Sequence, residues 1–305
     1  MRIKFWGVRG SIPCPGPSTA IYGGNTVCLE IRFTDVNRML IIDAGSGIRP
    51  LGNFLMANDI SQGLKLIDIY LTHTHWDHIL GFPFFTPMYI PGMHIRIHGP
   101  TTYEDDSLAK VIGGQFVYRY FPVRIEELAS TIEYIEIGEE SFDLGDGITV
   151  STKYLNHPIA CIGYRIEYKG KSFVTVFDSE PYRNLFSTDP SDPSYIENAA
   201  REGEQAAKEQ NRRVEKFFAD ADFIIYDAQY TREEYENGKR GWGHSSIEYA
   251  IEAAFRNKVK KLALIHHDPE RTDAQIEALA TRFCNPEIRG PMEIFFAKEG
   301  MEIEV

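Results

Sequence analysis

The sequence contains no apolar run that approaches the roughly 20 residues a membrane-spanning helix needs. Its first residues, Met1 to Trp6, also lack the long apolar stretch and the small-residue cleavage site of a signal peptide. These absences predict a protein with no membrane partner and, by default, a cytoplasmic location. The apolar fraction, 43% of 305 residues, is nevertheless enough for a large core.

Cysteine is also scarce. The chain has four cysteines, which are widely separated and show no C-x-x-C spacing. This pattern argues against a disulfide framework and against a cysteine zinc site. Cys28 and Cys161 fall in apparent strands and are predicted to be small core residues.

The sequence has fewer basic than acidic residues. Thirty-two Lys and Arg residues stand against 44 Asp and Glu residues, which gives a formal net charge of −12. A broad nucleic-acid-binding surface would normally be basic, so this balance favours a small substrate over RNA. Bound divalent cations would change the local field without changing the global balance.

What the sequence does contain is a dense group of metal-ligand residue types within Leu71–Pro83. The apolar, β-branched run just before it predicts a buried strand. In an extended chain His73 and His75 point to the same side, and Asp77 and His78 follow where the chain turns. Buried carboxylates are rare without a partner, and clustered nitrogen and oxygen ligands are what zinc needs. The alternative interpretation is a polar surface loop.

This H-x-H-x-D-H pattern after a strand resembles the signature of the metallo-β-lactamase superfamily, and its continuation to Pro83 resembles the phosphodiesterase branch, which includes ribonuclease Z and small cyclic phosphodiesterases. The resemblance covers most of residues 1–180 and 220–300. It implies an α/β fold, a four-layer αβ/βα sandwich of two mixed β-sheets flanked by helices. We expect a single domain over residues 1–305, with a helical insertion at about 181–218.

The resemblance also implies two divalent metal ions in a cleft at one edge of the sheets. His157 and Asp178 both end expected strands, and His266 is preferred to His267 because it directly follows the last core strand. Zinc is the favoured metal for such ligands, with manganese and iron as alternatives. One metal is expected on His73, His75 and His157, the other on Asp77, His78 and His266, with Asp178 bridging the two.

His244 immediately precedes an expected helix, where free backbone N–H groups favour anions such as phosphate. In ribonuclease Z-like enzymes a histidine before Ser or Thr protonates the leaving oxygen, supported by a glutamate at the end of an earlier strand. The matching position here is Asp227, one methylene shorter, so the resemblance implies an Asp227–His244 pair in this role. Asp77 is expected to orient the attacking hydroxide as well.

Three local patterns predict structure outside the site. Val123–Glu126 is expected to be a strand, and Ser245 with Glu248 matches the S-x-x-E capping box of a helix. Asp192 or Ser194 is expected to cap a long, charged helix that runs to Phe218. That helix has only a thin apolar stripe, so most of it should be solvated. It could serve as an arm, a lid or an element of a homodimer.

Together these features favour a metal-dependent phosphodiesterase that uses a metal-bridging hydroxide to cleave a small phosphodiester such as a cyclic nucleotide. An RNA 3′-processing nuclease is the first alternative. A lactonase or thioesterase is the second, because such relatives share H-x-H-x-D-H. A non-catalytic, metal-stabilised binding protein is the third.

Overall fold

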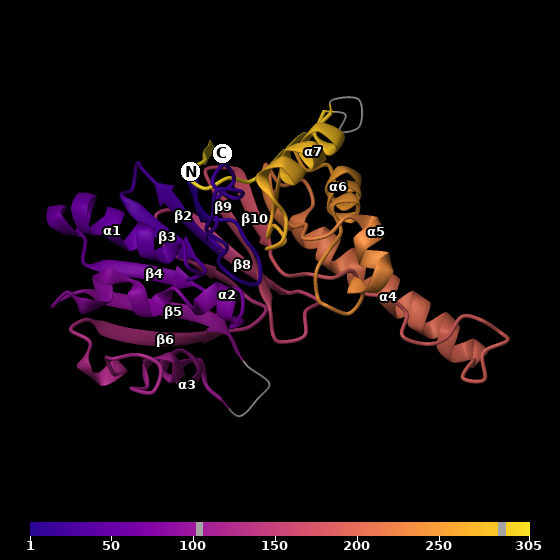
Figure 1. The fold of residues 1–305 in the computed structure, drawn as a ribbon, viewed down its shortest axis with the longest axis horizontal. Coiled ribbons are helices and arrows are strands. Elements are labelled where there is room, and N and C mark those ends of the chain that lie inside the picture. Colours follow the sequence, from indigo (N-terminus) through magenta and orange to yellow (C-terminus); the bar gives the residue numbers. More distant parts are fainter. Residues whose placement is uncertain (102–105, 286–290) are drawn as a thin grey trace.

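A computed structural model describes residues 1–101, 106–285 and 291–305, and shows two seven-stranded sheets packed face to face (Figure 1). The first sheet has the order β14-β1-β2-β3-β4-β5-β6 and comprises β1 (Arg2–Gly7), β2 (Cys28–Phe33), β3 (Arg38–Ile42), β4 (Leu66–Tyr70), β5 (His94–Pro100), β6 (Thr131–Ile137) and β14 (Glu302–Glu304). The second has the order β13-β12-β11-β10-β9-β8-β7 and comprises β7 (Ser141–Asp143), β8 (Ile148–Tyr154), β9 (Ile162–Tyr168), β10 (Lys171–Val176), β11 (Phe223–Asp227), β12 (Lys261–Ile265) and β13 (Glu293–Phe296).

Both sheets are mixed, and they repeat one pattern. Strands β14, β1, β2 and β3 pair antiparallel, and β3, β4, β5 and β6 pair parallel. In the second sheet β7 to β10 pair antiparallel, and β10 to β13 pair parallel. The parallel strands are covered on both faces, which explains why β11 is buried at every residue.

Helices cover the outer face of each sheet and complete four layers. The helices are α1 (Ile48–Asn58), α2 (Trp76–Ile79), α3 (Leu108–Gly113), α4 (Glu197–Phe218), α5 (Arg232–Glu234), α6 (Ile247–Arg256) and α7 (Asp273–Phe283). One apolar core lies between the sheets, a second under α1 and α3 on the first sheet, and a third under α4, α6 and α7 on the second. This arrangement confirms the predicted sandwich.

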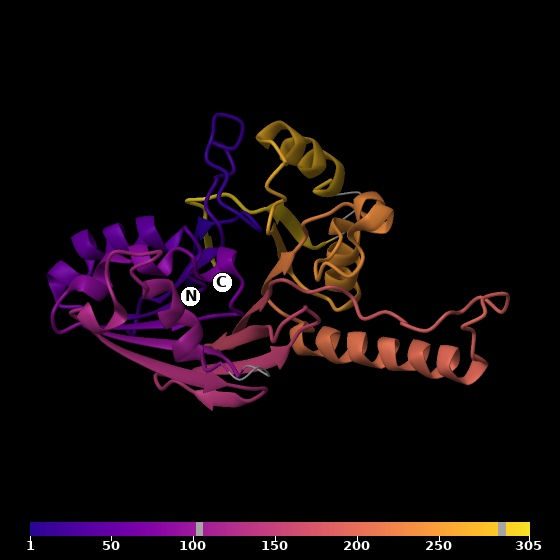
Figure 2. The same ribbon diagram turned by 60° about the horizontal axis from the view of Figure 1, so that its bottom comes forward.

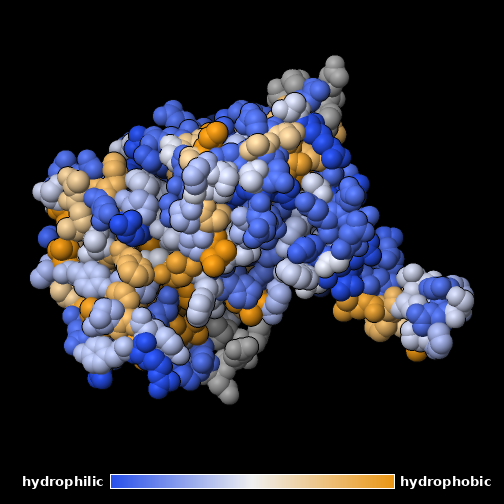
Figure 3. Space-filling model, in the orientation of Figure 1, coloured by the Kyte–Doolittle hydropathy of each residue, from blue (hydrophilic) through white to orange (hydrophobic). Residues whose placement is uncertain are grey.

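The long, charged helix expected to run to Phe218 is α4, and its N-terminal half projects from the rest of the molecule (Figure 2). The segment before it runs back along the helix, where Asn184 Nδ2 donates to the carbonyl of Ala200 at 2.7 Å. Apolar surface lies along this arm (Figure 3), and Leu185, Phe186 and Ile196 are exposed on it. Among the described helices, α4 included, none is long and apolar enough to cross a membrane.

Two local predictions about helix ends were wrong. Ile196 occupies the cap position of α4 without a side-chain cap, in place of the expected Asp192 or Ser194. Helix α6 is capped by Ser246, whose hydroxyl accepts the N–H of Tyr249 at 3.2 Å, not by Ser245. The hydroxyl of Ser245 is used elsewhere, because it donates to the carbonyl of Ser179.

The prediction of a strand at Val123–Glu126 was also wrong. The chain forms a short 3-10 helix there, Ile125–Glu127. The carboxylate of Glu127 accepts the backbone N–H of Arg124 at 2.7 Å, and such a local bond competes with strand pairing.

Candidate active site

The candidate site lies where strands of the two sheets end at one edge of the sandwich. His73 follows β4, His157 follows β8, and Asp178 follows β10. Asp227 is the last residue of β11, and His266 directly follows β12. Carboxyl ends of parallel strands are a common place for ligands in α/β folds, because side chains from several strands converge there.

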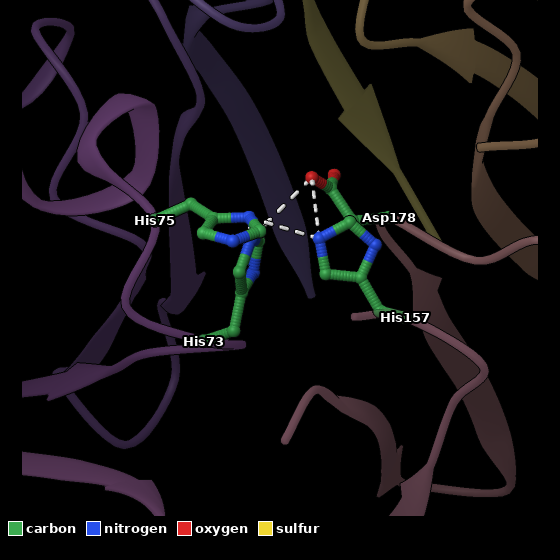
Figure 4. A group of neighbouring side chains, drawn as sticks. All are labelled: His73, His75, His157 and Asp178. Carbon is green, nitrogen blue, oxygen red and sulfur yellow. Dashed lines mark hydrogen bonds and ion pairs between the residues drawn. The ribbon is translucent and has the colours of Figure 1, made fainter. Parts of the chain in front are cut away.

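Three imidazoles form the first cluster, which we call the nitrogen group: His73, His75 and His157. His75 Nδ1 lies 3.1 Å from His73 Nε2 and 2.9 Å from His157 Nε2 (Figure 4). Asp178 Oδ2 lies 3.4 Å from His73 Nε2 and 3.8 Å from His157 Nε2. Nitrogens bound to one tetrahedral zinc would lie about 3.3 Å apart, so the spacing suits a single ion.

The second cluster, the mixed group, consists of Asp77, His78 and His266, all buried. Asp77 Oδ2 lies 3.1 Å from His266 Nε2 and 3.5 Å from His78 Nε2. Asp178 stands between the two groups: its Oδ2 lies 3.3 Å from His78 Nε2, and its Oδ1 lies 3.3 Å from His266 Nε2. The position of Asp178 is that expected of a bridging carboxylate.

Hydrogen bonds on the far side of the rings leave Nε2 of the mixed group facing the centre. His78 Nδ1 donates to Asp43 Oδ2 at 2.8 Å, and His266 Nδ1 donates to Gln229 Oε1 at 3.1 Å. Such outer partners select the tautomer and orient the ring of a metal-binding histidine. His267, by contrast, points away and donates from Nε2 to the carbonyl of Ala297 at 2.8 Å.

Two glycines allow loops to approach the imidazoles closely. A Cβ atom at Gly243 would lie 2.4 Å from His157 Nδ1, and a Cβ atom at Gly10 would lie 2.3 Å from the ring of His266. The carbonyl of Gly243 accepts the Nδ1 proton of His157 at 2.9 Å. A larger residue at either position would displace the ring.

Unsatisfied buried atoms indicate that the clusters fit metal ions. Within the described chain, His78 Nε2 and Asp178 Oδ1 are buried and make no hydrogen bond, although each has an ion-pair contact at 3.3 Å. A buried polar atom without a hydrogen bond is costly, and a cation among these nitrogen and oxygen donors would satisfy both. The donor set of two His/Asp clusters that share the buried Asp178 is therefore consistent with a dinuclear metal site.

The protonation states also suit metal binding. Burial lowers the pKa of His157 to about 4 and lowers the pKa of His73 well below its usual value, so both rings are neutral near pH 7. For His78 burial opposes the charged form, but Asp178, Asp77 and Asp43 raise its pKa well above the usual value. A metal would therefore displace a proton from His78.

A third group adjoins both clusters. Asp227 Oδ2 accepts from His244 Nδ1 at 3.0 Å, and the ring of His244 stacks on that of His266 with centroids 4.8 Å apart. Burial lowers the pKa of His244, but the carboxylate of Asp227, with smaller contributions from Asp178 and Asp77, outweighs this and raises the pKa to about 9 in the metal-free protein. The His244 imidazolium is thus charged at neutral pH.

Comparisons with known proteins show which proteins resemble this chain in sequence and in fold. No family model matches the chain. A ribonuclease Z from Lactococcus lactis is 24% identical over 300 residues, covering 87% of this chain and 88% of that protein. The metallo-β-lactamase fold protein YhfI from Bacillus subtilis superposes with a TM-score of 0.65 over 99% of this chain and 98% of that chain, at 16% identity. A diphosphatase from the PhnP family superposes with a TM-score of 0.61 over 100% of this chain and 97% of that chain, also at 16% identity.

The chain has the metallo-β-lactamase fold and is similar in sequence to ribonuclease Z. In this metallo-β-lactamase-fold chain the structure brings together every residue that the sequence predicted for the site. Their roles as metal ligands and proton donor stay predictions. The residues are His73, His75, Asp77, His78, His157, Asp178, Asp227, His244 and His266.

The sequence analysis did not predict three residues that support the site, which are Gln229, Ser11 and Glu180. Gln229 orients His266 and stands two residues after Asp227, so strand alternation at the end of β11 was an available signal. Ser11 donates its N–H to Asp77 Oδ2 at 2.7 Å. Glu180, two residues after Asp178, carried no recognisable pattern.

Proposed function

We propose that this protein is a dinuclear metal-dependent hydrolase, and that it cleaves a small phosphodiester. The observation that carries the proposal is the Asp227–His244 pair lying against both ligand groups, His266 on one side and His157 on the other. A thioester expels a thiolate that leaves without a proton, whereas a phosphodiester expels an alkoxide that must be protonated, as a lactone also does. The similarity to ribonuclease Z favours the phosphodiester over the lactone.

In the proposed reaction the bound cations, Asp77 and His244 would have separate roles. Two divalent cations, zinc by preference, would supply a nucleophile from water near neutral pH and offset the phosphoryl charge. Asp77 would orient the attacking water, since its Oδ2 is fixed by the N–H of Ser11 at 2.7 Å. His244, held by Asp227 through Nδ1, would donate its Nε2 proton to the leaving oxygen.

The space beside the site supports a substrate of nucleotide size or smaller. A cavity of about 430 Å³ is lined by Thr74, Tyr154, His157 and other residues, and a second of about 320 Å³ adjoins it at His157 and Pro158. Small-molecule sites commonly lie in this range. The net charge of −12 also favours a small ester over a polyanion.

The test of the proton donor compares leaving groups. In His244→Ala, turnover of a phosphodiester with an alkoxide leaving group, such as a 3′,5′-cyclic nucleotide, should fall by about 10²-fold or more. Turnover of bis(p-nitrophenyl) phosphate should fall much less, because p-nitrophenolate leaves without a proton, and metal content should be unchanged. Equal losses on both substrates would overturn the role of His244.

RNA 3′-end processing is the second candidate. It is favoured by the relatives named ribonuclease Z, which this chain matches over most of their length. Binding of a short RNA that weakens steeply with salt, together with cleavage near its 3′ end, would support this function. Cleavage of small esters alone would support the lead proposal.

A further inference from the structure

Glu180 is a buried carboxylate to which the proposed mechanism gives no part. Its side chain is 5% exposed, and its ion pair with Arg183 Nε is long, at 4.0 Å. The carboxylate instead accepts the hydroxyl of Tyr235 at 2.6 Å and the backbone N–H of Gly243 at 3.0 Å. The N–H of Gly241 lies 2.8 and 2.9 Å from its two oxygens.

These hydrogen bonds occupy the carboxylate. A carboxylate offers about four acceptor positions, and protein donors fill nearly all of them here. Glu180 is therefore not available as a metal ligand or as a general base. Its charge is balanced by backbone N–H groups that converge where Gly241 and Gly243 adopt positive φ angles, +84° and +85°.

The backbone of Glu180 is tied to a second segment. Its N–H donates to the carbonyl of Asn156 at 2.9 Å, and Asn156 Nδ2 donates to its carbonyl at 3.0 Å. One residue thus connects the turn that carries His157, the strand end that carries Asp178 and the loop that carries His244.

We propose that Glu180 is a positioning residue for the metal centre, acting by holding the loop at Gly241–Gly243 so that the carbonyl of Gly243 fixes His157. That carbonyl takes the Nδ1 proton of His157, and Nε2 then faces the nitrogen group with its lone pair. The inference rests on the dinuclear site of the proposed function but not on its substrate.

Zinc affinity measured by competition with a chromophoric chelator tests this role without any substrate. Glu180→Gln keeps the shape of the side chain but replaces one acceptor oxygen by an amide donor, which would face a backbone N–H. We expect zinc to bind the nitrogen group about 10-fold more weakly, the loss typical when an outer partner of a ligand is removed. Tyr235→Phe removes one bond to the same carboxylate and should give a smaller loss in the same direction.

The matched control is Asp222→Asn. Asp222 also accepts a backbone N–H, that of Ser172 at 3.0 Å, but it lies at the opposite end of β11 from Asp227. The zinc affinity of the Asp222→Asn protein should equal that of the wild type.

A double-mutant cycle separates positioning from general destabilisation. If Glu180 acts through His157, adding Glu180→Gln to His157→Ala should cause no further loss of zinc affinity. Wild-type affinity in Glu180→Gln and Tyr235→Phe, or losses that simply add in the double variant, would overturn the proposal. Both results concern zinc affinity and not phosphodiester turnover. The positioning role of Glu180 and the phosphodiesterase activity can therefore fail independently.

Discussion

The nitrogen group and the mixed group share Asp178 but differ in access. His75 is partly exposed, and His157 lines both cavities. Asp77, His78 and His266 are all buried, beneath the loop that carries Gly10 and Ser11. The nitrogen group is therefore open to solvent at His75, whereas the mixed group, which includes the Asp77 assigned to the attacking water in the proposed function, is closed.

Each group is supported by a buried charge bound to loop backbone, and the two charges have opposite sign. The guanidinium of Arg9 donates to the carbonyls of Gly23 and Arg271 at 2.8 and 2.6 Å, next to the Gly10 that touches His266. Glu180 accepts backbone N–H groups beside His157. A charge satisfied by loop backbone can order a loop without competing for the metal.

The largest expected effect comes from the residue that both groups share. Asp178→Asn removes a negative charge that faces both groups, although the side chain keeps its size. We expect metal content to fall below two ions per chain and turnover to fall by about 10³-fold or more. Metal analysis beside the rate measures this, and a variant that retains two ions and near-normal rate would remove Asp178 from the bridge.

Single alanine variants should separate the groups by stability. In metal-free protein, His78→Ala leaves the carboxylate of Asp43 buried without its 2.8 Å partner, which should cost about 3 kcal/mol in the free energy of unfolding. His75→Ala should cost about 1 kcal/mol or less, because its ring is partly exposed and its Nδ1 contacts two other histidines and no buried carboxylate at hydrogen-bond distance among the described residues. Urea denaturation with chelator present gives both values, and equal costs would contradict the comparison.

The smallest expected effect is kinetic. Excess chelator should remove the two metals in separate phases, and the faster phase should belong to the nitrogen group because solvent reaches it more readily. His75→Ala should abolish the fast phase and leave the slow one. A single phase, or a fast phase that survives in His75→Ala but disappears in His78→Ala, would reverse the assignment of the open half.

The sequence predicted the fold, and it predicted which residues come together where the signal is local. His73, His75, Asp77 and His78 fall within six residues after a strand, and strand ends marked His157, Asp178 and His266. The partners that orient them are distant in sequence: Gly243 lies 86 residues from His157, and Asp43 lies 35 residues from His78. Only the fold sets such pairings. The cap of α6 was displaced by one residue because Ser245 found a tertiary partner in Ser179.

We propose that metals held by the two ligand groups hydrolyse phosphodiesters. The most direct test is hydrolysis of bis(p-nitrophenyl) phosphate by protein of measured metal content, beside the same protein stripped by chelator and then reloaded. The account predicts turnover with about two metals bound, its loss on stripping and its return on reloading. Absence of turnover with two metals bound would contradict the account and shift the weight to lactone or thioester substrates.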